Sequence, residues 1–180
     1  ITMGISLFSC IRDDAEKTAT LCYDKICQKA ENIVKVARDL GNEYGVPIIN
    51  KRVSITPASL ITANFPGKEI VLAKALDRAA KTVGVDFLGG YSALVHKGMT
   101  SFERSFIESI PEALSITDRM CSSVNVGSSK SGINMDAVKL MGNIIKDTAE
   151  KTKENDGLGC AKLVVFCNAV EDNPFMAGAF

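Results

Sequence analysis

Cys-Ser-Ser-Val-Asn-Val-Gly-Ser-Ser-Lys-Ser-Gly-Ile-Asn, residues 121–134, is the stretch around which the rest of the chain can be ordered. It begins as a short strand, residues 121–126, continues as a loop of Gly and Ser with one Lys, and leads into a helix that opens near Asn134. A strand followed by a glycine loop and a helix N-terminus presents backbone N–H groups and a positive dipole end to an anion. This stretch therefore predicts both an α/β unit and a candidate binding site.

Strands and helices alternate on both sides of this stretch. The apolar patterns predict strands at 1–8, 48–55, 85–88, 121–126 and 161–170, and helices at 15–44, 68–83, 102–114 and 135–153. The alternation predicts an α/β fold with a largely parallel sheet, in a single domain that covers residues 1–180. Two details are specific expectations: one long amphipathic helix over 15–44, and a strand over 161–170 that is buried on both faces.

Composition narrows the class of protein. Basic and acidic residues balance at 21 and 21 of 180, and no cluster of Lys or Arg stands out, so we expect no nucleic-acid partner. No apolar run reaches the roughly 18 residues that a membrane-spanning helix needs. The six cysteines are scattered without a Cys-x-x-Cys pair, which favours reduced thiols in a cytoplasmic protein.

The loop after the strand at 121–126 is the main candidate anion site. Its backbone N–H groups, three hydroxyls and one ammonium group could hold a phosphate or a carboxylate; the residues are Gly127, Ser128, Ser129, Lys130 and Ser131. A phosphate loop of the nucleotide triphosphatases is disfavoured because the lysine stands two residues too early, ahead of Gly132. A flexible polar connection is the alternative interpretation.

Other polar residues are expected near the same strand ends. Asn125 and Asn168 would orient the bound anion, and Lys51 or Arg52 would neutralise its remaining charge. Side chains alternate along a strand, so one of these two cations faces the layer on which the strand packs and needs a partner there. That partner is either an anion or an acidic side chain at the strand end.

Catalytic and metal-binding candidates are weaker. Cys121 lies beside the candidate site and could act as a nucleophile, and His96 is the only histidine. Glu171, Asp172 and Asn173 follow the last strand and could hold Mg²⁺ or Ca²⁺ through hard oxygen ligands, or could cap the next element.

Four blocks of the sequence resemble a known family. Residues 50–57, 85–95, 121–134 and 162–180 are similar to the proteins called "PFL family", which are pyruvate-formate-lyase-like. The resemblance implies a barrel related to pyruvate formate-lyase and ribonucleotide reductase, with parallel strands inside and helices outside. It also implies a cytoplasmic homodimer and a longer chain, of which residues 1–180 would be the N-terminal half-barrel. It identifies no functional residues, so none are carried over.

The combined prediction is an enzyme that acts on a small phosphorylated or carboxylated metabolite bound at the carboxyl ends of the strands. The alternative is a non-catalytic metabolite-sensing or scaffold protein that forms a homodimer. Dimerisation through the long helix over 15–44 would need only the apolar stripe of that helix.

Overall fold

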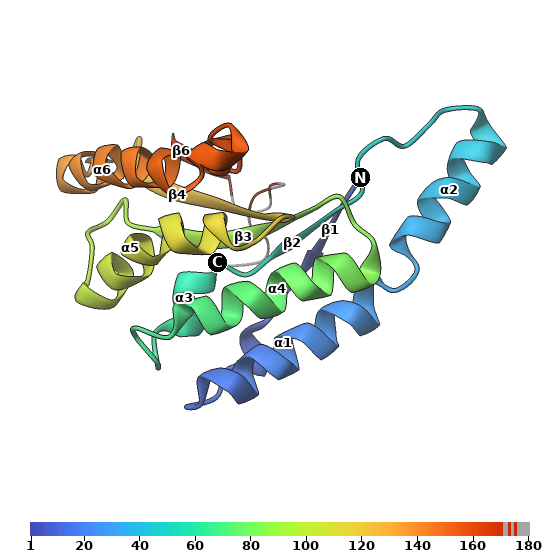
Figure 1. Cartoon of the computed structure of the whole chain (residues 1–180), viewed down its shortest axis with the longest axis horizontal. Helices are drawn as coiled ribbons and strands as arrows, with labels where there is room; N and C mark the ends of the chain where they lie inside the picture. The colour runs from blue at the N-terminus through green and yellow to red at the C-terminus, as the bar shows by residue number, and fades with distance from the viewer. Residues whose placement is uncertain (171–172, 174, 176–180) are drawn as a thin grey trace.

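The computed structural model describes residues 1–170, 173 and 175, and its centre is a six-stranded sheet. The parallel strands lie in the order β1 (Thr2–Ile5), β2 (Arg52–Ile55), β3 (Phe87–Leu94), β4 (Met120–Ser128) and β6 (Leu163–Cys167). The short strand β5 (Gly132–Ile133) pairs antiparallel with the end of β4. The predicted α/β class with a largely parallel sheet is confirmed (Figure 1).

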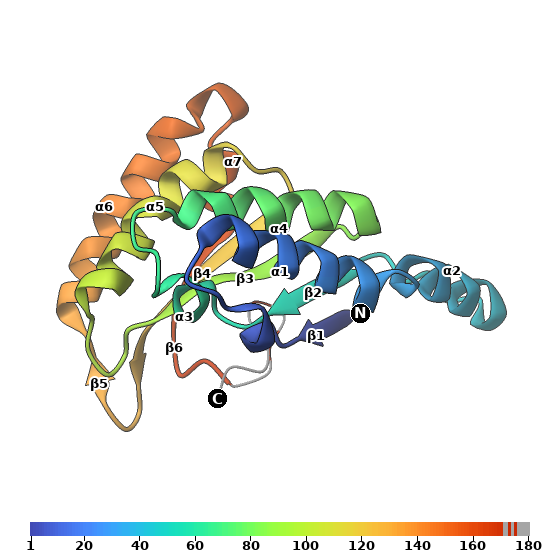
Figure 2. The same ribbon diagram turned by 90° about the horizontal axis from the view of Figure 1, so that it is seen from below.

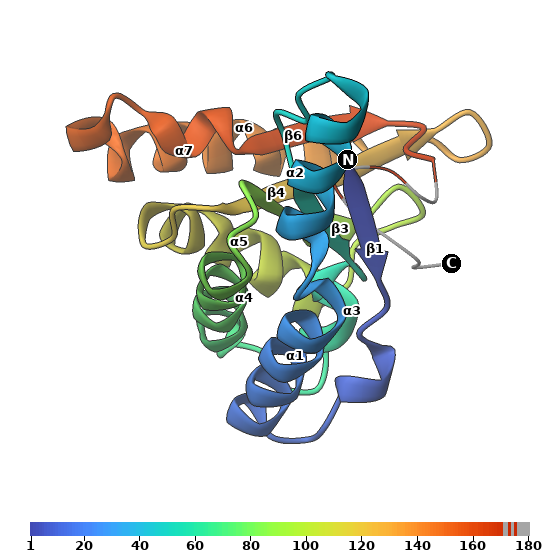
Figure 3. The same ribbon diagram turned by 90° about the vertical axis from the view of Figure 1, so that its right-hand side faces the viewer.

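The main helices cover one face of this sheet (Figures 2 and 3). They are α1 (Ala15–Ala30), α4 (Glu69–Val83), α5 (Ser101–Ser115) and α6 (Met135–Lys151), with the shorter α3 (Ala58–Thr62) and α7 (Leu158–Ala161) beside them. Two 3₁₀ turns complete the described chain, η1 (Phe8–Cys10) and η2 (Lys153–Asn155). Among the described residues, no helix covers the opposite face of the sheet, which we call the open face.

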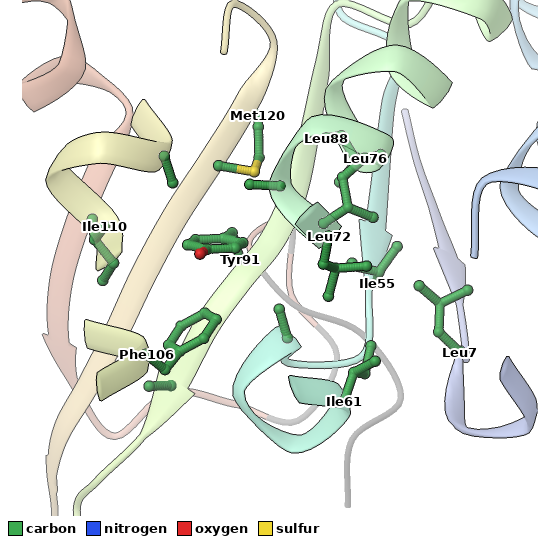
Figure 4. Packing of buried hydrophobic residues seen from close by; sticks show 14 of the residues in the cluster. Leu7, Ile55, Ile61, Leu72, Leu76, Leu88, Tyr91, Phe106, Ile110 and Met120 are labelled. Carbon is green, nitrogen blue, oxygen red and sulfur yellow. The ribbon is translucent and has the colours of Figure 1, made fainter. Parts of the chain in front are cut away.

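The core forms between the helices and the sheet because side chains alternate along each strand. On β2, Val53 and Ile55 are fully buried under the helices, whereas Arg52 and Ser54 lie on the open face. Helices and strands contribute together to one apolar cluster, which Figure 4 shows around Tyr91; it includes Leu72 and Leu76 of α4, Phe106 and Ile110 of α5, and Leu88 and Met120 of the strands.

Gly90 explains why β3 is longer than the sequence predicts. Its φ of +118° is rarely adopted by L residues, and a Cβ at this position would lie 2.3 Å from Cγ1 of Ile55. The register between β3 and β4 shifts between Gly89 and Tyr91, so a bulge carries the strand through both glycines to Leu94. The expectation that the strand ends at residue 88 is therefore wrong.

The prediction of one continuous helix over residues 15–44 is also wrong. The helix breaks at residues 31–32, and α2 (Ile33–Tyr44) leaves the body of the molecule in another direction (Figure 2). At the break, Asn32 is the N-cap residue of α2, and its side chain donates to the carboxylate of Glu31 and does not cap the backbone of the new helix. The apolar stripe continues into α2, yet Leu40 and Tyr44 stay exposed because no described element packs on them.

Two further expectations need correction. The strand predicted over 161–170 is shorter, Leu163–Cys167, and only half-buried, because in the described sheet it pairs with β4 alone and no helix covers the open face. The described strands form an open sheet with β1 at one edge, so the barrel implied by the resemblance is not shown. Within the described residues, no helix has the length and apolar character to cross a bilayer.

Candidate functional site

The Gly/Ser stretch that follows Cys121 is a β-hairpin tip and not an open loop. Strand β4 continues to Ser128, and the chain returns as β5 from Gly132. The hydroxyls of Ser128 and Ser131 lie 2.6 Å apart, and the backbone N–H of Ser131 donates to Oγ of Ser128. These hydroxyls therefore stabilise the turn itself.

Asn168 connects this hairpin to the end of β6. Its Oδ1 accepts from both the backbone N–H of Ser129, at 2.5 Å, and the Ser129 hydroxyl, at 3.0 Å. Gly127 allows the close pairing at this point, because a Cβ there would lie 2.9 Å from Sγ of Cys167 and 3.0 Å from the carbonyl oxygen of Gly132. Lys130 stands exposed at the tip, and no bond or ion pair of its ammonium group occurs in the described part of the chain.

A cavity of about 500 Å³ lies beside the hairpin, where β3 and β4 end. We call it the rim cavity. Its walls come from the connection between β3 and α5, the first turn of α5, the hairpin, and the start of α6. The lining residues are His96, Gly98, Met99, Thr100, Ser101, Arg104, Ser131, Ile133, Asn134 and Asp136. In parallel α/β sheets, ligands bind outside the carboxyl ends of the strands, which is where this cavity lies.

The N-termini of α5 and α6 both lie at the rim cavity, and capping residues in the local sequence determine where each helix begins. Thr100 and Glu103 form a reciprocal capping box that begins α5. Asn134 begins α6: its Oδ1 accepts from the N–H of Ala137, and its Nδ2 donates to the carbonyl oxygen of Val95. These bonds hold the first turn of each helix at the cavity wall.

The ionisable groups at the rim cavity are one guanidinium, one imidazole and one carboxylate. Arg104 is half-exposed, and its Nη1 lies 3.7 Å from Oε1 of Glu108, a loose ion pair; no other described residue forms an ion pair with its guanidinium. Burial, and then the charge of Lys97, lower the pKa of His96, so its imidazole is neutral near pH 7. Asp136 is the opposing charge, so a bound anion would lie nearer Arg104.

Asn125 sets the orientation of His96. With its amide turned to satisfy its neighbours, the Asn125 nitrogen donates to the carbonyl oxygens of Phe166, at 3.0 Å, and Gly127, at 2.9 Å. The amide oxygen then lies 3.4 Å from Nδ1 of His96 and can accept a hydrogen bond from the Nδ1–H group. Neutral His96 consequently keeps Nε2 as an acceptor, the form that a general base needs.

The structure separates the two cations of the β2 region. Lys51 pairs with Asp86, with 3.2 Å between Nζ and Oδ2, and its backbone N–H donates to the same carboxylate. Arg52 lies on the open face, where it lines a smaller cavity of about 160 Å³ together with Cys121 and Phe87. Lys51 therefore makes the strand-end ion pair that the sequence left as one alternative, and Arg52 does not.

The metal candidates lie mostly outside the described residues. Glu171 and Asp172 are not described; Asn173 is, with its Nδ2 donating to the carbonyl oxygen of Val170 and its Oδ1 accepting from the N–H of Phe175. Over residues 1–170, 173 and 175, no group of three or more His, Cys, Asp or Glu side chains is arranged to hold a metal ion.

Of the residues that line the rim cavity, His96 and Ser131 are candidates from the sequence alone, and Arg104 and Asp136 are not. The signal for Arg104 was present: Thr100 followed three residues later by Glu103 is a capping-box pattern, and it begins a helix four residues after His96. The place of Asp136 could not be predicted without the hairpin, because the turn back through β5 brings the start of α6 to the end of β3.

Comparison with known proteins gives a consistent family. A family model described as "Uncharacterised ACR (DUF711)" matches residues 1–180. A UPF0210 protein of Thermoanaerobacter sp. (strain X514) is 63% identical over 182 residues, and one of Lachnoclostridium phytofermentans is 60% identical over 183 residues. A UPF0210 protein of Methanocorpusculum labreanum is likewise 60% identical over 183 residues. Each match covers 100% of this chain and 40% of the relative.

These matches overturn one expectation from the sequence. The resemblance to the "PFL family" was wrong, since the match at full coverage is to another family. The chain spans about 40% of the length of the curated relatives that it matches. On the match over its whole length, this chain belongs to the DUF711 family, whose curated relatives carry the name UPF0210.

Proposed function

We propose that this chain binds a small anionic metabolite, phosphorylated or carboxylated, in the rim cavity. The observation that carries the proposal is the convergence of Arg104 with the N-termini of α5 and α6 on one cavity at the carboxyl ends of β3 and β4. Guanidinium N–H groups and free backbone N–H groups at a helix start are donors that suit an oxyanion.

His96 makes an enzymatic role the favoured form of this proposal. Its neutral imidazole, held by Asn125 with Nε2 as acceptor, can remove a proton from a ligand hydroxyl or from an acidic C–H group. Ser131 and Thr100 add hydroxyls that can orient the ligand. Lys130 does not line the cavity, so it contributes to the proposal only as a nearby positive charge at the hairpin tip.

Binding is tested first by ligand-induced stabilisation of the full-length protein. Inorganic phosphate, glycerol phosphate and succinate serve as probes, and ligand at 100 times its dissociation constant should stabilise by about 2.7 kcal/mol. In Arg104→Gln the loss of a charge-assisted bond should weaken binding about tenfold or more. Lys74→Gln, which removes an exposed charge from α4, is the matched control and should bind like wild type.

The variants also separate the rim cavity from the hairpin tip. If Lys130→Gln loses binding and Arg104→Gln keeps it, the anion lies at the tip and the rim-cavity proposal is wrong. If no probe binds, or binding is indifferent to both charges, the proposal is overturned as well. For any probe that binds, His96→Gln should keep binding but lose turnover measured by NMR; binding without turnover in wild type would leave the sensing role.

A scaffold role is the second candidate, and α2 favours it. Val36, Leu40 and Tyr44 on this helix, with Val46 and Ile49 just after it, are exposed apolar side chains. Such a surface is typical of an interface. Multi-angle light scattering of the full-length protein and of Leu40→Glu/Tyr44→Glu would test it: a homodimer that becomes a monomer supports the scaffold role, and an unchanged mass in both proteins excludes it for this surface.

A further inference from the structure

The open face of the sheet carries a cation that is only partly satisfied. Arg52 begins β2, and the alternation that buries Val53 directs Arg52 to the open face. Its Nε is buried and has no hydrogen-bond partner, and among the described residues no carboxylate lies within ion-pair distance of its guanidinium. The ring of Phe87 lies 5.5 Å from its Cζ and supplies a cation–π contact instead.

A buried donor without an acceptor is unfavourable unless something else supplies the acceptor. The neighbouring cation shows the contrast, because Lys51 has both a carboxylate and a backbone carbonyl as partners. A guanidinium donates in a rigid planar fork, and a carboxylate accepts from that fork with two parallel bonds. Arg52 therefore has the chemistry of a carboxylate receptor.

The space for a ligand comes from Gly89. In the register of the sheet, Gly89 of β3 lies between Ser54 of β2 and Cys121 of β4. Because glycine has no side chain, the sheet is hollowed at this position, and the cavity of about 160 Å³ opens there. Cavities of about 150 Å³ hold a molecule the size of benzene, so the ligand is a small organic molecule.

The walls of this hollow define the class of ligand. Phe87, Ala161 and Phe175 contribute apolar surface, and Arg52 is the one charged residue among the described lining residues. The remaining side chain is Cys121, whose thiol is free. One positive charge against apolar walls suits a monoanion with a short hydrocarbon part better than a phosphate monoester, which carries close to two negative charges.

We propose that the hollow between Arg52 and Cys121 is a second binding site, for a small organic monocarboxylate. The guanidinium binds the carboxylate, the hydrocarbon part lies against Phe87 and Phe175, and the Cys121 thiol lies beside the ligand. This site lies on the open face near the start of β2 and β4, so it does not depend on the rim cavity.

Selective alkylation of Cys121 in the full-length protein tests the site. Iodoacetate and iodoacetamide react in the same way: the thiolate forms a bond to carbon, iodide leaves, and the thiol proton goes to solvent. The two reagents differ in the carboxylate, which Arg52 should bind. We expect the ratio of iodoacetate to iodoacetamide rates at Cys121, measured by peptide mass spectrometry, to exceed that at the exposed Cys167 about tenfold.

Variants of Arg52 test whether its guanidinium causes the preference for iodoacetate. Arg52→Gln should reduce the ratio at Cys121 to that of Cys167, Arg52→Lys should restore part of it, and Arg104→Gln should leave it unchanged. An equal ratio at both cysteines in wild type, or a high ratio that survives Arg52→Gln, would overturn the proposal. Loss of the ratio in Arg104→Gln would show that the preference arises at the rim cavity and would also overturn it.

Protection of the wild-type protein is a measurement that needs no variant. Propionate and propionamide have the same size and shape, and only propionate carries the carboxylate. Propionate should slow the alkylation of Cys121 by iodoacetamide without slowing that of Cys167, and propionamide should not protect. Equal protection by both, or by neither, contradicts a carboxylate site at Arg52.

Discussion

The two faces of the sheet differ in the kind of side-chain contact that they make. Under the helices, the strands present apolar side chains such as Val53 and Val124, and these are fully buried in the core. On the open face, the same strands present hydroxyls, and Ser92 and Ser123 bond to each other at 2.6 Å. The first face is specified by volume and the second by hydrogen bonds, so mutations on the two faces should act through different mechanisms.

The charges of the two faces differ in the same way. On the helix side, Asp77 of α4 is nearly buried and fully paired: its carboxylate accepts from the N–H groups of Asp118 and Arg119 and from Nζ of Lys81. On the open face, Arg52 keeps a buried donor without an acceptor. A charge that the fold satisfies acts in stability, whereas a buried donor that the described residues leave unsatisfied calls for another partner, and the ligand proposed at Arg52 would supply it.

The largest expected effect compares two phenylalanines. Phe106 is fully buried under the helices, with its ring centroid 4.5 Å from that of Tyr91, and Phe106→Ala should lower the free energy of unfolding by about 3–5 kcal/mol. Phe166 on the open face is half-buried and makes an edge contact with Phe175, so Phe166→Ala should cost about 1–2 kcal/mol. Urea denaturation followed by circular dichroism measures both, and equal losses would contradict the contrast between the faces.

The next effect concerns the paired charge at Asp77. Burial acts to raise the pKa of this carboxyl, but its bonds to Lys81 and to two backbone N–H groups outweigh burial and hold the pKa below the ordinary 3.8. Since the folded-state pKa lies below the unfolded one, the stabilisation is complete above the unfolded pKa and is lost as the pH falls through the folded pKa. Asp77→Asn should lower stability by about 1–3 kcal/mol at pH 7 and by less in acid.

Urea denaturation from neutral pH down to strong acid tests this prediction. The difference in stability between wild type and Asp77→Asn should begin to shrink near the ordinary carboxyl pKa and should vanish once the pH is below the lower folded-state pKa. Lys81→Gln leaves the two backbone bonds in place, so its curve should lie between them. A constant difference at every pH would mean that Asp77 acts through shape alone and not through its charge.

Much of the fold could be predicted because local patterns and tertiary packing agree along most of the chain. The helix from Glu69 to Val83 follows its apolar stripe and ends at Gly84, which has a φ of +80°. The sequence failed where distant contacts decide the local structure. Gly90 looks like the end of a strand until the approach of Ile55 is known. The stripe over 15–44 likewise does not reveal that Leu40 and Tyr44 in its second half stay exposed.

The candidate sites were harder to predict because each is assembled from separate strands. Lys130 and its serines are adjacent in sequence and suggested a cradle, but Ser128 and Ser131 bond to each other within the turn, and Ser129 bonds to Asn168. The hollow at Arg52 joins β2, β3 and β4, and only the parallel register places Phe87 beside Arg52 and Gly89 beside Cys121. Sequence alone indicated the residue types, and the sheet determined which of them meet.

The smallest expected effect concerns the hydroxyl pair of the open face. Ser123→Ala removes the partner of the Ser92 hydroxyl, which lies 3.4 Å from the carbonyl oxygen of Phe175 and can turn to donate there. The loss should therefore be only about 0.5–1.5 kcal/mol, within the range of a single hydrogen bond. Val124→Ala, at the next residue on the opposite face, removes buried volume and should cost more.

A double-mutant cycle of Ser92→Ala and Ser123→Ala, measured by urea denaturation, isolates the pair. A coupling of about 0.5–1 kcal/mol would mean that hydrogen bonds between strands stabilise the open face. Additive losses would mean that each hydroxyl acts with other partners. A double variant as stable as wild type would contradict the idea that hydrogen bonds specify this face. In that case the hydroxyl pair adds nothing to folding, and ligand binding at Arg52 would be the remaining reason for polar side chains on this face.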